Sequence, residues 1–473
     1  MAVHATLTRE IDEGPSGPQI GAFFDLDGTL LAGFSAYEFL RDAILRGRMG
    51  AADLAETLRS VARFQLGQVG FSGLVTGTTT MWKGREESEF AAIGERLFAD
   101  RLAAAIYPES RALVDAHRRK GHTLAVVSAA TRYQVDPVAR DLEIPHVLCT
   151  RLALRDGRFT GAVVRPTCYG DGKALAVRRF ARQRRVKPRQ SYFYTDSHED
   201  LPLLEAVGRP RPINPDRRLT DIAVARGWPM RRFTSRGTAR PVDILRTGLT
   251  MASLVPSVLL GLPAGILEGS RRRAVNLAMA TWGELGTAFA GVNVQVVGEQ
   301  HLWSHRPAVF IFNHQSGIDT LLLCKLLRRD FVGIAKQELR RNPIFGPLFA
   351  LSGTVFIDRF DREKAIRALQ PAVDALRHGL SLAIAPEGTR SATPRLGPFK
   401  KGAFHLAMTA KVPIVPIVFR NTLDALPKHG VLIRPATVEA VVFPPISTAA
   451  WTPADLDQQI AAIHRLYTDT LKG

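Results

Sequence analysis

Short apolar runs that end in polar residues mark the strands predicted for the first part of the chain. These runs cover residues 20–24, 123–128 and 191–194. A buried strand of a parallel sheet, closed by a turn, has this pattern. Residues 34–106 repeat Ala, Leu and Arg at helical spacing instead. Strands alternating with helices predict an α/β unit over residues 20–215, preceded by a polar tail at 1–19.

The same alternation returns after residue 291 and predicts a second α/β unit. Its apolar runs cover residues 308–313, 354–357, 381–385 and 414–419. We expect this unit to extend over residues 293–450 and to be followed by a C-terminal helix at 451–473. The fold class predicted for the whole chain is therefore α/β, with two separate sheets.

An apolar segment lies between the two predicted units. Residues 247–267 contain no charge over 21 positions, which reaches the length of a membrane span. Pro256 and Pro263 are expected to kink or break a straight helix there. Arg271–Arg273 follow, and Glu284 is then the only charged residue up to position 292. We expect residues 247–292 to form a membrane-associated helical segment.

The charge of the chain indicates an anionic partner. Among 473 residues, 63 Lys and Arg stand against 44 Asp and Glu, a net charge of +19. Lipid headgroups and nucleic acid are the two obvious candidates. Residues 209–246 hold ten Arg against three Asp. This stretch, of which 216–246 is expected to be a basic linker, is either a plain linker or a headgroup-binding segment. No nucleic acid is expected, because no basic stretch alternates with stacking aromatic residues.

The cysteines and the first residues bear on the compartment. Three cysteines, with no CxxC pair, argue against a disulfide framework or a zinc ribbon and favour a reducing environment. Residues 1–19 contain no apolar run, so no signal peptide is expected. We expect the chain to begin in the cytoplasm.

Polar groups gather at the ends of the first three predicted strands. Asp25 and Asp27 follow the first strand, and Ser128 ends the second. Lys173 lies in the sequence Tyr-Gly-Asp-Gly-Lys, and Asp196 ends the third strand, four residues before Asp200. Since α/β proteins build their sites at the carboxyl ends of strands, these side chains are expected to meet.

In this order, the four motifs resemble those of the haloacid dehalogenase superfamily, and within it the phosphoserine-phosphatase-like branch (subfamily IB). The resemblance implies a Rossmann-like domain with a helical cap, here at about residues 34–106. It also implies that Asp25 attacks phosphorus and that Asp27 serves as acid and then base. Ser128 and Lys173 would bind the phosphoryl oxygens.

The same resemblance implies a Mg²⁺ site. Asp25, Asp196 and the main-chain carbonyl of Asp27 would bind the ion, which prefers oxygen ligands. Asp200 would orient the metal shell or Lys173. The fourth motif departs from the family, because Thr-Asp-Ser-His-Glu-Asp replaces Gly-Asp-Gly followed by Asn or Asp. The alternative is a catalytically silent domain that serves as a scaffold or ligand sensor.

A second group of motifs lies in the C-terminal unit. His314 and Asp319 lie between a predicted strand and a predicted helix. Ser316 and Asp319 also fit a capping box, which would give Asp319 a purely local role. The later segments Gly353–Arg359, Pro386–Ser391 and Val412–Pro416 favour a functional interpretation instead.

These blocks resemble the glycerolipid acyltransferase family, especially the 1-acylglycerol-3-phosphate O-acyltransferases. The resemblance implies that His314 is the general base for the acceptor hydroxyl and that Asp319 orients its ring. Arg390 and Arg359 would clamp the phosphate of the acceptor, with Lys336 near it. Substrate contacts are also implied for the neighbouring motif residues Glu387, Gly388 and Thr389.

Together these resemblances predict a bifunctional enzyme on the cytoplasmic face of the cell membrane. Lysophosphatidate would receive an acyl group from acyl-CoA or acyl carrier protein, and the first domain would hydrolyse a phosphomonoester with Mg²⁺. Another acceptor, such as glycerol 3-phosphate or a different lysophospholipid, is the alternative. The sequence leaves open the phosphatase substrate and whether the chain forms a homo-oligomer.

The expected membrane geometry follows from keeping both units on one side. A single span through 247–267 would separate them. A two-span hairpin would keep them together but would carry Arg271–Arg273 across, against the positive-inside tendency. A re-entrant or interfacial element, broken at its prolines, leaves these arginines at the headgroups and is the preferred geometry. The two-span hairpin and burial in a soluble core remain alternatives.

Overall fold

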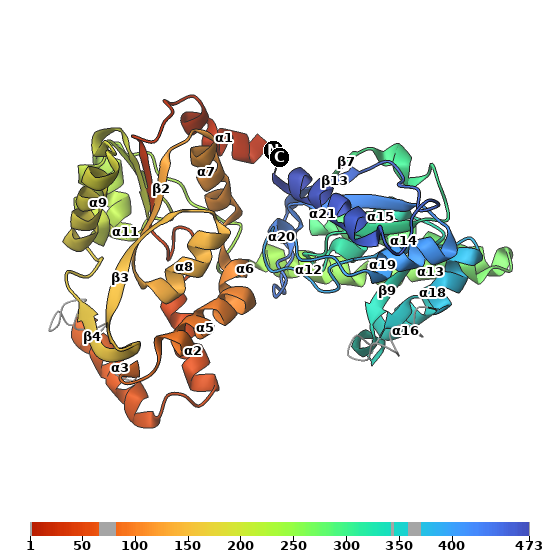
Figure 1. Ribbon diagram of the computed structural model, residues 1–473, viewed down its shortest axis with the longest axis horizontal. Helices are drawn as coiled ribbons and strands as arrows, with labels where there is room; N and C mark the ends of the chain where they lie inside the picture. The colour runs from red at the N-terminus through yellow and green to blue at the C-terminus, as the bar shows by residue number, and fades with distance from the viewer. Residues whose placement is uncertain (1, 66–81, 342–344, 358–369, 473) are drawn as a thin grey trace. The chain divides into compact units, whose positions relative to one another are not determined.

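The computed structural model describes residues 2–65, 82–341, 345–357 and 370–472. The chain divides into two compact units, Met1–Thr238 and Ala239–Gly473. Each unit contains its own sheet with helices on both faces (Figure 1). The α/β class predicted from the alternating apolar runs is confirmed.

The first unit is built on a six-stranded sheet in the order β4-β3-β2-β1-β5-β6. Only β4 runs antiparallel to its neighbour. The strands are β1 (Gly21–Phe24), β2 (Thr123–Thr131), β3 (His146–Arg155), β4 (Arg158–Val164), β5 (Tyr192–Thr195) and β6 (Arg209–Pro212). Because β1 lies between β2 and β5, the polar residues that follow these three strands lie side by side.

Helices cover both faces of this sheet. On one face lie α1 (Ala2–Asp12), α7 (Pro108–Arg119) and α8 (Arg132–Asp141), and on the other α9 (Asp171–Arg184), α10 (Leu201–Ala206) and α11 (Arg217–Ala225) (Figure 1). Alternate residues of β1 separate the two cores: Phe24 packs on the first set and Phe23 on the second. This is the period of two expected for a strand buried on both faces.

A helical insertion follows β1. It comprises α2 (Ser35–Leu45), α3 (Ala51–Gln65), α5 (Glu87–Leu97), the π-helical turn η2 (Phe98–Leu102) and α6 (Ala103–Ala105). An aromatic cluster of Trp82, Phe90, Tyr133 and Phe159 joins it to α8 and to β4. The 3-10 turns η3 (Pro188–Gln190) and η4 (His198–Asp200) flank β5.

Two expectations about the borders of this unit were wrong. Residues 1–19 are not simply a polar tail, because Leu7 and Ile11 of α1 are buried in the core beside α7. Residues 216–246 are not a linker, because Leu219 of α11 is fully buried and Asp216 caps that helix. In both segments a few apolar residues at helical spacing are buried, although charged residues outnumber them.

The second unit is built on a seven-stranded sheet in the order β10-β9-β11-β8-β12-β13-β7. The first five strands in this order are parallel, and β13 runs antiparallel to β12. The strands are β7 (Val292–Val297), β8 (Val309–Phe312), β9 (Phe331–Lys336), β10 (Val355–Ile357), β11 (Ser381–Ile384), β12 (Ile414–Arg420) and β13 (Ala436–Val442).

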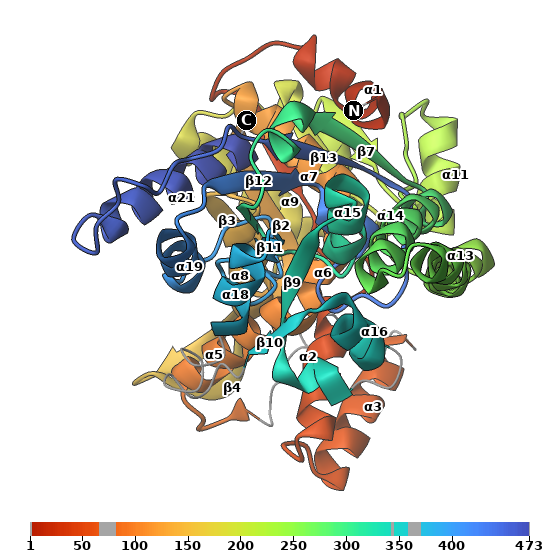
Figure 2. The same ribbon diagram turned by 90° about the vertical axis from the view of Figure 1, so that its right-hand side faces the viewer.

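Helices again cover both faces (Figure 2). On one face lie α14 (Arg271–Ala290) and α15 (Asp319–Leu327), and on the other α18 (Gln370–Arg377), α19 (Gly402–Ala410) and α21 (Leu456–Lys472). The shorter elements are η5 (Glu299–Leu302), η6 (Gln337–Arg341), α16 (Phe345–Ser352) and α20 (Thr422–Ala425). Tyr467 of α21 is fully buried and donates to the carbonyl of Ile311 in β8 at 2.7 Å.

The apolar segment forms a helical hairpin with α14. It consists of α12 (Pro241–Ala252) and α13 (Leu254–Leu267). In the described residues, the run Pro241–Leu267 is the one helix long and apolar enough to cross a membrane. The helical run is interrupted at Ser253, close to Pro256, whereas the break expected at Pro263 does not occur, since α13 continues through that residue. Close packing supports it there, since a Cβ on Gly265 would lie 2.6 Å from Cβ of Ala274 in α14.

The arginines after the hairpin turn bind protein groups rather than lying free for headgroups. Arg271 donates to the carbonyls of Ala350 and Leu351, and Arg272 donates to that of Ser352. These carbonyls end α16, where a positive charge is favourable. Arg273 is exposed and pairs with Glu268 at 2.9 Å.

The far half of α14 packs on the sheet unit. A Cβ on Gly283 would lie 2.3 Å from the main-chain nitrogen of Lys325 in α15, so only glycine allows this approach. Glu284 forms ion pairs with Lys325 and Arg328.

Candidate active sites

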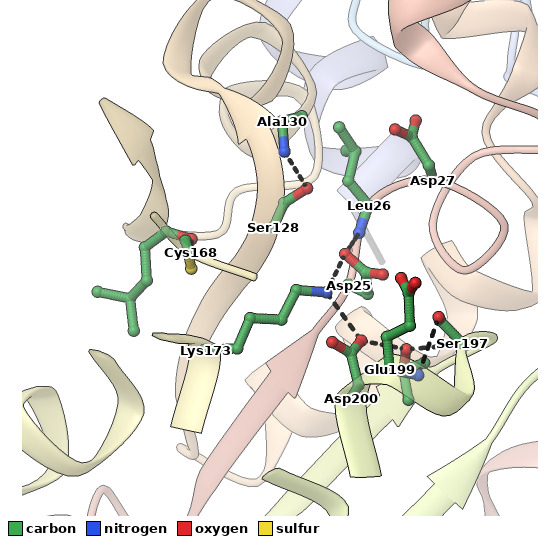
Figure 3. Close-up of polar contacts among 12 residues, drawn as sticks. Asp25, Leu26, Asp27, Ser128, Ala130, Cys168, Lys173, Ser197, Glu199 and Asp200 are labelled. Atoms are coloured by element: carbon green, nitrogen blue, oxygen red, sulfur yellow. Dashed lines mark hydrogen bonds and ion pairs between the residues drawn. The ribbon is translucent and has the colours of Figure 1, made fainter. Parts of the chain in front are cut away.

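Lys173 joins two carboxylates at the carboxyl edge of the first sheet. Its Nζ lies 3.0 Å from Oδ1 of Asp25, directly after β1, and 2.8 Å from Oδ2 of Asp200, in η4. Figure 3 shows the lysine side chain between these two residues, with Ser128 and Asp27 nearby. The structure thus brings together side chains that lie up to 175 positions apart in the sequence.

The charge of Lys173 is retained although the residue is buried. Burial by itself lowers the pKa of an ammonium group, but the carboxylates of Asp25 and Asp200 outweigh it and raise the pKa of Lys173. Thr195 at the end of β5 donates to the same oxygen of Asp200 at 2.6 Å. Asp200 is thereby fixed as the partner of the lysine, one of the two alternatives expected for it.

Asp25 and Asp196 form an electrostatically strained pair. Burial, only partly offset by Lys173, raises the pKa of Asp25 to about 7. Burial and the charge of Asp25 raise the pKa of Asp196 to about 8. Asp196 lies against the loop after β1, since a Cβ on Gly28 would be 2.1 Å from its Oδ2. Two carboxylates that repel each other, one buried and one half-buried, provide the oxygen donors that suit a hard divalent cation.

Two side chains, those of Asp25 and Asp196, provide oxygen donors that fit Mg²⁺. Within the described ranges, no cluster of three His, Cys, Asp or Glu side chains is arranged to hold a metal. The side-chain donors are therefore Asp25 and Asp196, and the third protein ligand expected here is the main-chain carbonyl of Asp27. The carboxylate of Asp27 makes different contacts.

Asp27 is held by the start of the helical insertion. Its two oxygens accept from the main-chain N–H and the hydroxyl of Ser35, at 2.7 and 3.1 Å. Gln134 in turn donates to that hydroxyl at 3.1 Å and accepts from the N–H of Thr131 at 2.8 Å. Burial raises the pKa of Asp27 to about 6. A carboxyl with this pKa can hold a proton near neutral pH, as a general acid requires.

Ser35 and Gln134 were not found by the sequence analysis. Thr131-x-x-Gln134 is a capping-box pattern and predicts the start of α8. That signal could have placed Gln134 near the end of β2. Nothing in the sequence links it to Ser35, 99 positions earlier.

In the second unit, His314 and Asp319 form a hydrogen-bonded pair beyond the end of β8. Nδ1 of His314 lies 2.8 Å from Oδ2 of Asp319, the first residue of α15. The carboxyl group is fully buried, whereas the imidazole side chain is 30% exposed. Nε2 is therefore the ring nitrogen left for a substrate, as in other His–carboxylate pairs.

The capping box expected from Ser316 and Asp319 is only half present. Oδ2 of Asp319 also accepts from the main-chain N–H of Ser316 at 3.0 Å, as a capping box requires. The hydroxyl of Ser316 instead donates to the carbonyl of Leu426 at 2.6 Å. Asp319 thus fixes the loop and orients His314 with the same oxygen atom.

Glu387 holds the main chain of His314. Its Oε1 accepts from the N–H of His314 at 2.9 Å, and its Oε2 from the N–H of Gly397 at 2.8 Å. Ser391 donates from its main-chain N–H to the carbonyl of His314 at 2.8 Å. Each oxygen of Glu387 thus accepts one main-chain N–H group, which makes the residue a positioning group for the loop of His314. Burial raises the pKa of this carboxyl.

A cavity of 1710 Å³ opens beside His314. One side is apolar and comes from the hairpin, including Leu254, Val258 and Trp282. The polar side carries four residues predicted for substrate: Lys336, Gly388, Thr389 and Arg390. Gly388 has a φ of +74°, which favours glycine at this turn. Arg359, predicted to bind phosphate, lies outside the described residues.

Two family models match the chain, one in each unit. Residues 22–205 match the haloacid dehalogenase-like hydrolases, and residues 293–420 match the acyltransferases. Both resemblances drawn from the motifs are thereby confirmed.

Individual relatives divide in the same way. A 1-acyl-sn-glycerol-3-phosphate acyltransferase of Cocos nucifera is 36% identical over 203 residues, which are 43% of this chain and 65% of that protein. The phosphoserine phosphatase SerB1 of Mycobacterium tuberculosis is 34% identical over 216 residues, 45% of this chain and 70% of that protein. A crystal structure of a Bordetella pertussis protein of unknown function is 30% identical, with a TM-score of 0.42, covering 45% of this chain and 97% of that one. The chain thus spans less than two thirds of the plant acyltransferase.

Proposed function

We propose that this chain, which belongs to the haloacid dehalogenase-like hydrolases through its first unit and to the acyltransferases through its second, is a bifunctional enzyme of lipid metabolism. Its second unit transfers an acyl group from acyl-CoA or acyl carrier protein to 1-acylglycerol 3-phosphate, which gives phosphatidate. Its first unit hydrolyses a phosphomonoester with Mg²⁺. The observation that carries the proposal is the His314–Asp319 pair beside a cavity with one apolar and one cationic side.

In the acyl transfer, His314 is the general base. Its Nδ1–H donates to Asp319, so Nε2 is the unprotonated nitrogen that takes the proton of the acceptor hydroxyl. The hydroxyl oxygen attacks the thioester carbonyl directly, and the carboxylate of Asp319 stabilises the imidazolium that forms. The acyl chain lies among the apolar side chains of the hairpin.

Acceptor binding rests on the cationic side of the cavity. Arg390 clamps the phosphate of the acceptor, because its planar fork of N–H donors matches two phosphoryl oxygens. Lys336, at the end of β9, contributes a second positive charge beside the same cavity. Arg359 is proposed as a further phosphate contact on the motif alone. Gly388 lets the loop pass close to Lys400, and Thr389 lines the cavity next to Arg390.

In the phosphatase, Asp25 is the nucleophile and Asp27 the acid. An oxygen of Asp25 attacks phosphorus while Lys173 and Ser128 bind phosphoryl oxygens. Asp27 gives its proton to the leaving alcohol and later takes one from the attacking water. Asp25 and Asp196 would hold Mg²⁺, which supplies positive charge to the phosphoryl group when bound.

We also propose that the chain lies on the cytoplasmic face of the membrane and is attached by α12 and α13. Apolar side chains cover their outer surface, among them Leu259 at 60%, Ile266 at 79% and Leu267 at 86% exposure. A patch of this kind on a soluble surface is a recognised mark of membrane contact. The inner surface packs on α14, which supports an interfacial hairpin.

Two substitutions in the full chain test the bifunctional proposal. His314→Ala should abolish acylation of lysophosphatidate and leave phosphate release from phosphomonoesters intact. Asp25→Asn should abolish phosphate release and leave acylation intact. In the unsubstituted chain, beryllium fluoride should inhibit phosphate release but not acylation. Acylation of glycerol 3-phosphate in preference to lysophosphatidate would overturn the proposed acceptor. Loss of both activities in either variant would contradict the assignment of two separate sites.

A further inference from the structure

A second, smaller pocket lies next to the proposed acid of the phosphatase. It has a volume of 380 Å³, within the range of small-ligand pockets, and its floor includes the buried Leu31 and Leu102. Ser35, whose N–H and hydroxyl bind the carboxylate of Asp27, belongs to its lining. Because Asp27 protonates the leaving oxygen, the alcohol part of a substrate must lie on this side of the site.

The rim of this pocket is aromatic and exposed. Phe34 is 71% exposed and Tyr37 63%, and both line the pocket. Phe34 precedes α2 in extended backbone and Tyr37 lies in the first turn of that helix, so both belong to the short stretch of chain that lines the pocket. Ile44 at 44% and Leu45 at 72% are further exposed apolar residues near the end of α2, beyond the Glu38–Arg41 ion pair. From Ser35 to Leu45 the helix rises about 15 Å.

We propose that the phosphatase takes a phosphomonoester whose alcohol carries an acyl chain, such as a lysophosphatidate. The inference rests on the proposed phosphatase function and names its substrate class. The polar head of the alcohol lies in the pocket beside Asp27, and the acyl chain lies along the apolar surface of α2. Burial of this surface by an apolar chain is favourable, whereas a small polar alcohol leaves it in water.

In the proposed reaction the phosphoryl group passes first to Asp25 and then to water. The bond between phosphorus and the leaving oxygen breaks as the bond to an oxygen of Asp25 forms, and Asp27 gives its proton to that leaving oxygen. Water then attacks the aspartyl phosphate and returns a proton to Asp27. The products are an acylated alcohol and inorganic phosphate.

A zwitterionic alcohol such as serine is the competing occupant. Glu38 and Arg101 also line the pocket, and an acid with a base would suit an amino acid. However, the carboxylate of Glu38 already pairs with Arg41 at 3.9 Å. The exposed rings of Phe34 and Tyr37 leave water only when an apolar group of the substrate covers them. The apolar rim therefore favours the acylated substrate.

The test measures phosphate release by the Mg²⁺-loaded full chain. The substrates are lysophosphatidates of increasing chain length, each below its micellar concentration, together with phosphoserine and glycerol 3-phosphate. We expect kcat/KM to rise with chain length and to exceed that of glycerol 3-phosphate by about tenfold or more. A larger kcat/KM for phosphoserine or glycerol 3-phosphate overturns this inference alone. Release no faster than in Asp25→Asn, with every substrate, overturns the phosphatase function itself.

Variants of the rim separate the pocket from a general attraction to lipid. Phe34→Ser and Tyr37→Ser should each lower the ratio of kcat/KM for lysophosphatidate to that for glycerol 3-phosphate by about tenfold. Val224→Ser is the matched control, since Val224 is 66% exposed on α11 and does not line the pocket. An unchanged ratio in both rim variants, with unchanged melting temperatures, overturns the inference.

Discussion

Nδ1 of His314 lies 2.8 Å from Oδ2 of Asp319, and the same oxygen accepts the main-chain N–H groups of Gln315 and Ser316. One atom therefore fixes both the ring tautomer and the loop that carries the ring. The orientation of the base and the fold of the loop cannot vary independently, because both depend on the negative charge of this carboxyl group.

Asp319→Asn should disable acyl transfer while leaving the fold intact. The amide oxygen can take the place of Oδ2 and keep the loop hydrogen bonds, but the amide carries no negative charge to stabilise the imidazolium that forms on His314. We expect kcat for acylation of lysophosphatidate to fall by about 10²–10⁴. Phosphate release by the first unit should be unchanged. Near-normal acylation by this variant would contradict the assigned role of the pair.

Glu387→Gln should weaken the enzyme without removing a substrate contact. Both carboxylate oxygens accept main-chain N–H groups, so an amide nitrogen would face one of these donors. We expect a loss of about 1–3 kcal/mol in the free energy of unfolding and a lower kcat with little change in KM for the acceptor.

The control is Glu299→Gln, an exposed glutamate in the same unit. It should change neither kcat nor the melting temperature. A Glu387→Gln enzyme with raised KM and normal kcat would instead restore the substrate contact expected from the motif.

The phosphatase should lose activity as pH rises through the pKa of Asp27. Burial raises this pKa to about 6, and the acid must be protonated to assist the leaving group, so kcat/KM should fall above about pH 6. The Ser35 hydroxyl stabilises the ionised carboxylate and lowers its pKa. Ser35→Ala should therefore move the descending limb to higher pH. The pH profile of kcat/KM with excess Mg²⁺ measures this shift.

The same shift has a consequence for stability. A carboxyl whose pKa is higher in the folded than in the unfolded chain favours folding only while it is protonated. Without metal, Asp27 should make the first unit less stable as pH rises from about 4 through about 6. Ser88→Ala, at an exposed position of α5, is the control and should shift neither profile. A limb that moves to lower pH in Ser35→Ala would reverse the assigned role of the hydroxyl.

The sequence predicted which motif residues lie together at strand ends better than it predicted the residues that hold them. Asp25, Lys173 and His314 lie in short motifs at strand ends, and parallel strands bring such ends together. The hold of Glu387 on the main chain of His314 spans 73 positions and leaves no local pattern. The Ser35–Gln134 contact is equally non-local. Positioning by hydrogen bonds between side chains and the main chain depends on tertiary packing. The periodicity of apolar residues in the sequence does not reveal such packing.

Charge patterns in the sequence did not predict the partners that the charged residues find within the fold. Arg271 and Arg272, expected at lipid headgroups, donate to carbonyls that end α16. Asp243 in the expected linker is fully buried between arginines, with Arg240 at 2.9 Å and Arg246 at 3.1 Å. A run of like charges indicates a solvated surface only if no acid or carbonyl group from elsewhere in the chain pairs with it.

Arg390→Ala should impair use of the phosphorylated acceptor more than use of the acyl donor. Losing a charge-assisted contact should cost about 1.5–3 kcal/mol, or roughly 10- to 150-fold in kcat/KM for lysophosphatidate. Arg390→Lys should recover part of this loss, because a point charge lacks the planar fork. Arg465→Ala, at an exposed position of α21, is the control. An equal loss toward a neutral monoacylglycerol acceptor would remove the clamp from the proposal.

Membrane attachment should depend on the outer face of α13 and resist salt. Ile266 and Leu267 are among its most exposed apolar residues, and burying each in lipid contributes about 1.5–3 kcal/mol. The double variant Ile266→Ser, Leu267→Ser should therefore sediment less with neutral vesicles at both low and high salt. Val431→Ser removes an equally exposed residue, at 81%, elsewhere in the unit and should bind as the unsubstituted chain does.

Labelling the turn of the hairpin distinguishes an interfacial helix pair from two membrane spans. Ser270 caps α14 next to the turn, and in an interfacial hairpin this position stays on the side of the catalytic units. With Cys149, the least buried of the three cysteines, replaced by Ser, a Ser270→Cys chain should react with an impermeant maleimide from the cytoplasmic side. Labelling from the opposite side alone would establish two membrane spans. That result would require Arg271 and Arg272 to leave the carbonyls of α16, because α16 belongs to the part of the unit that carries the sheet and His314.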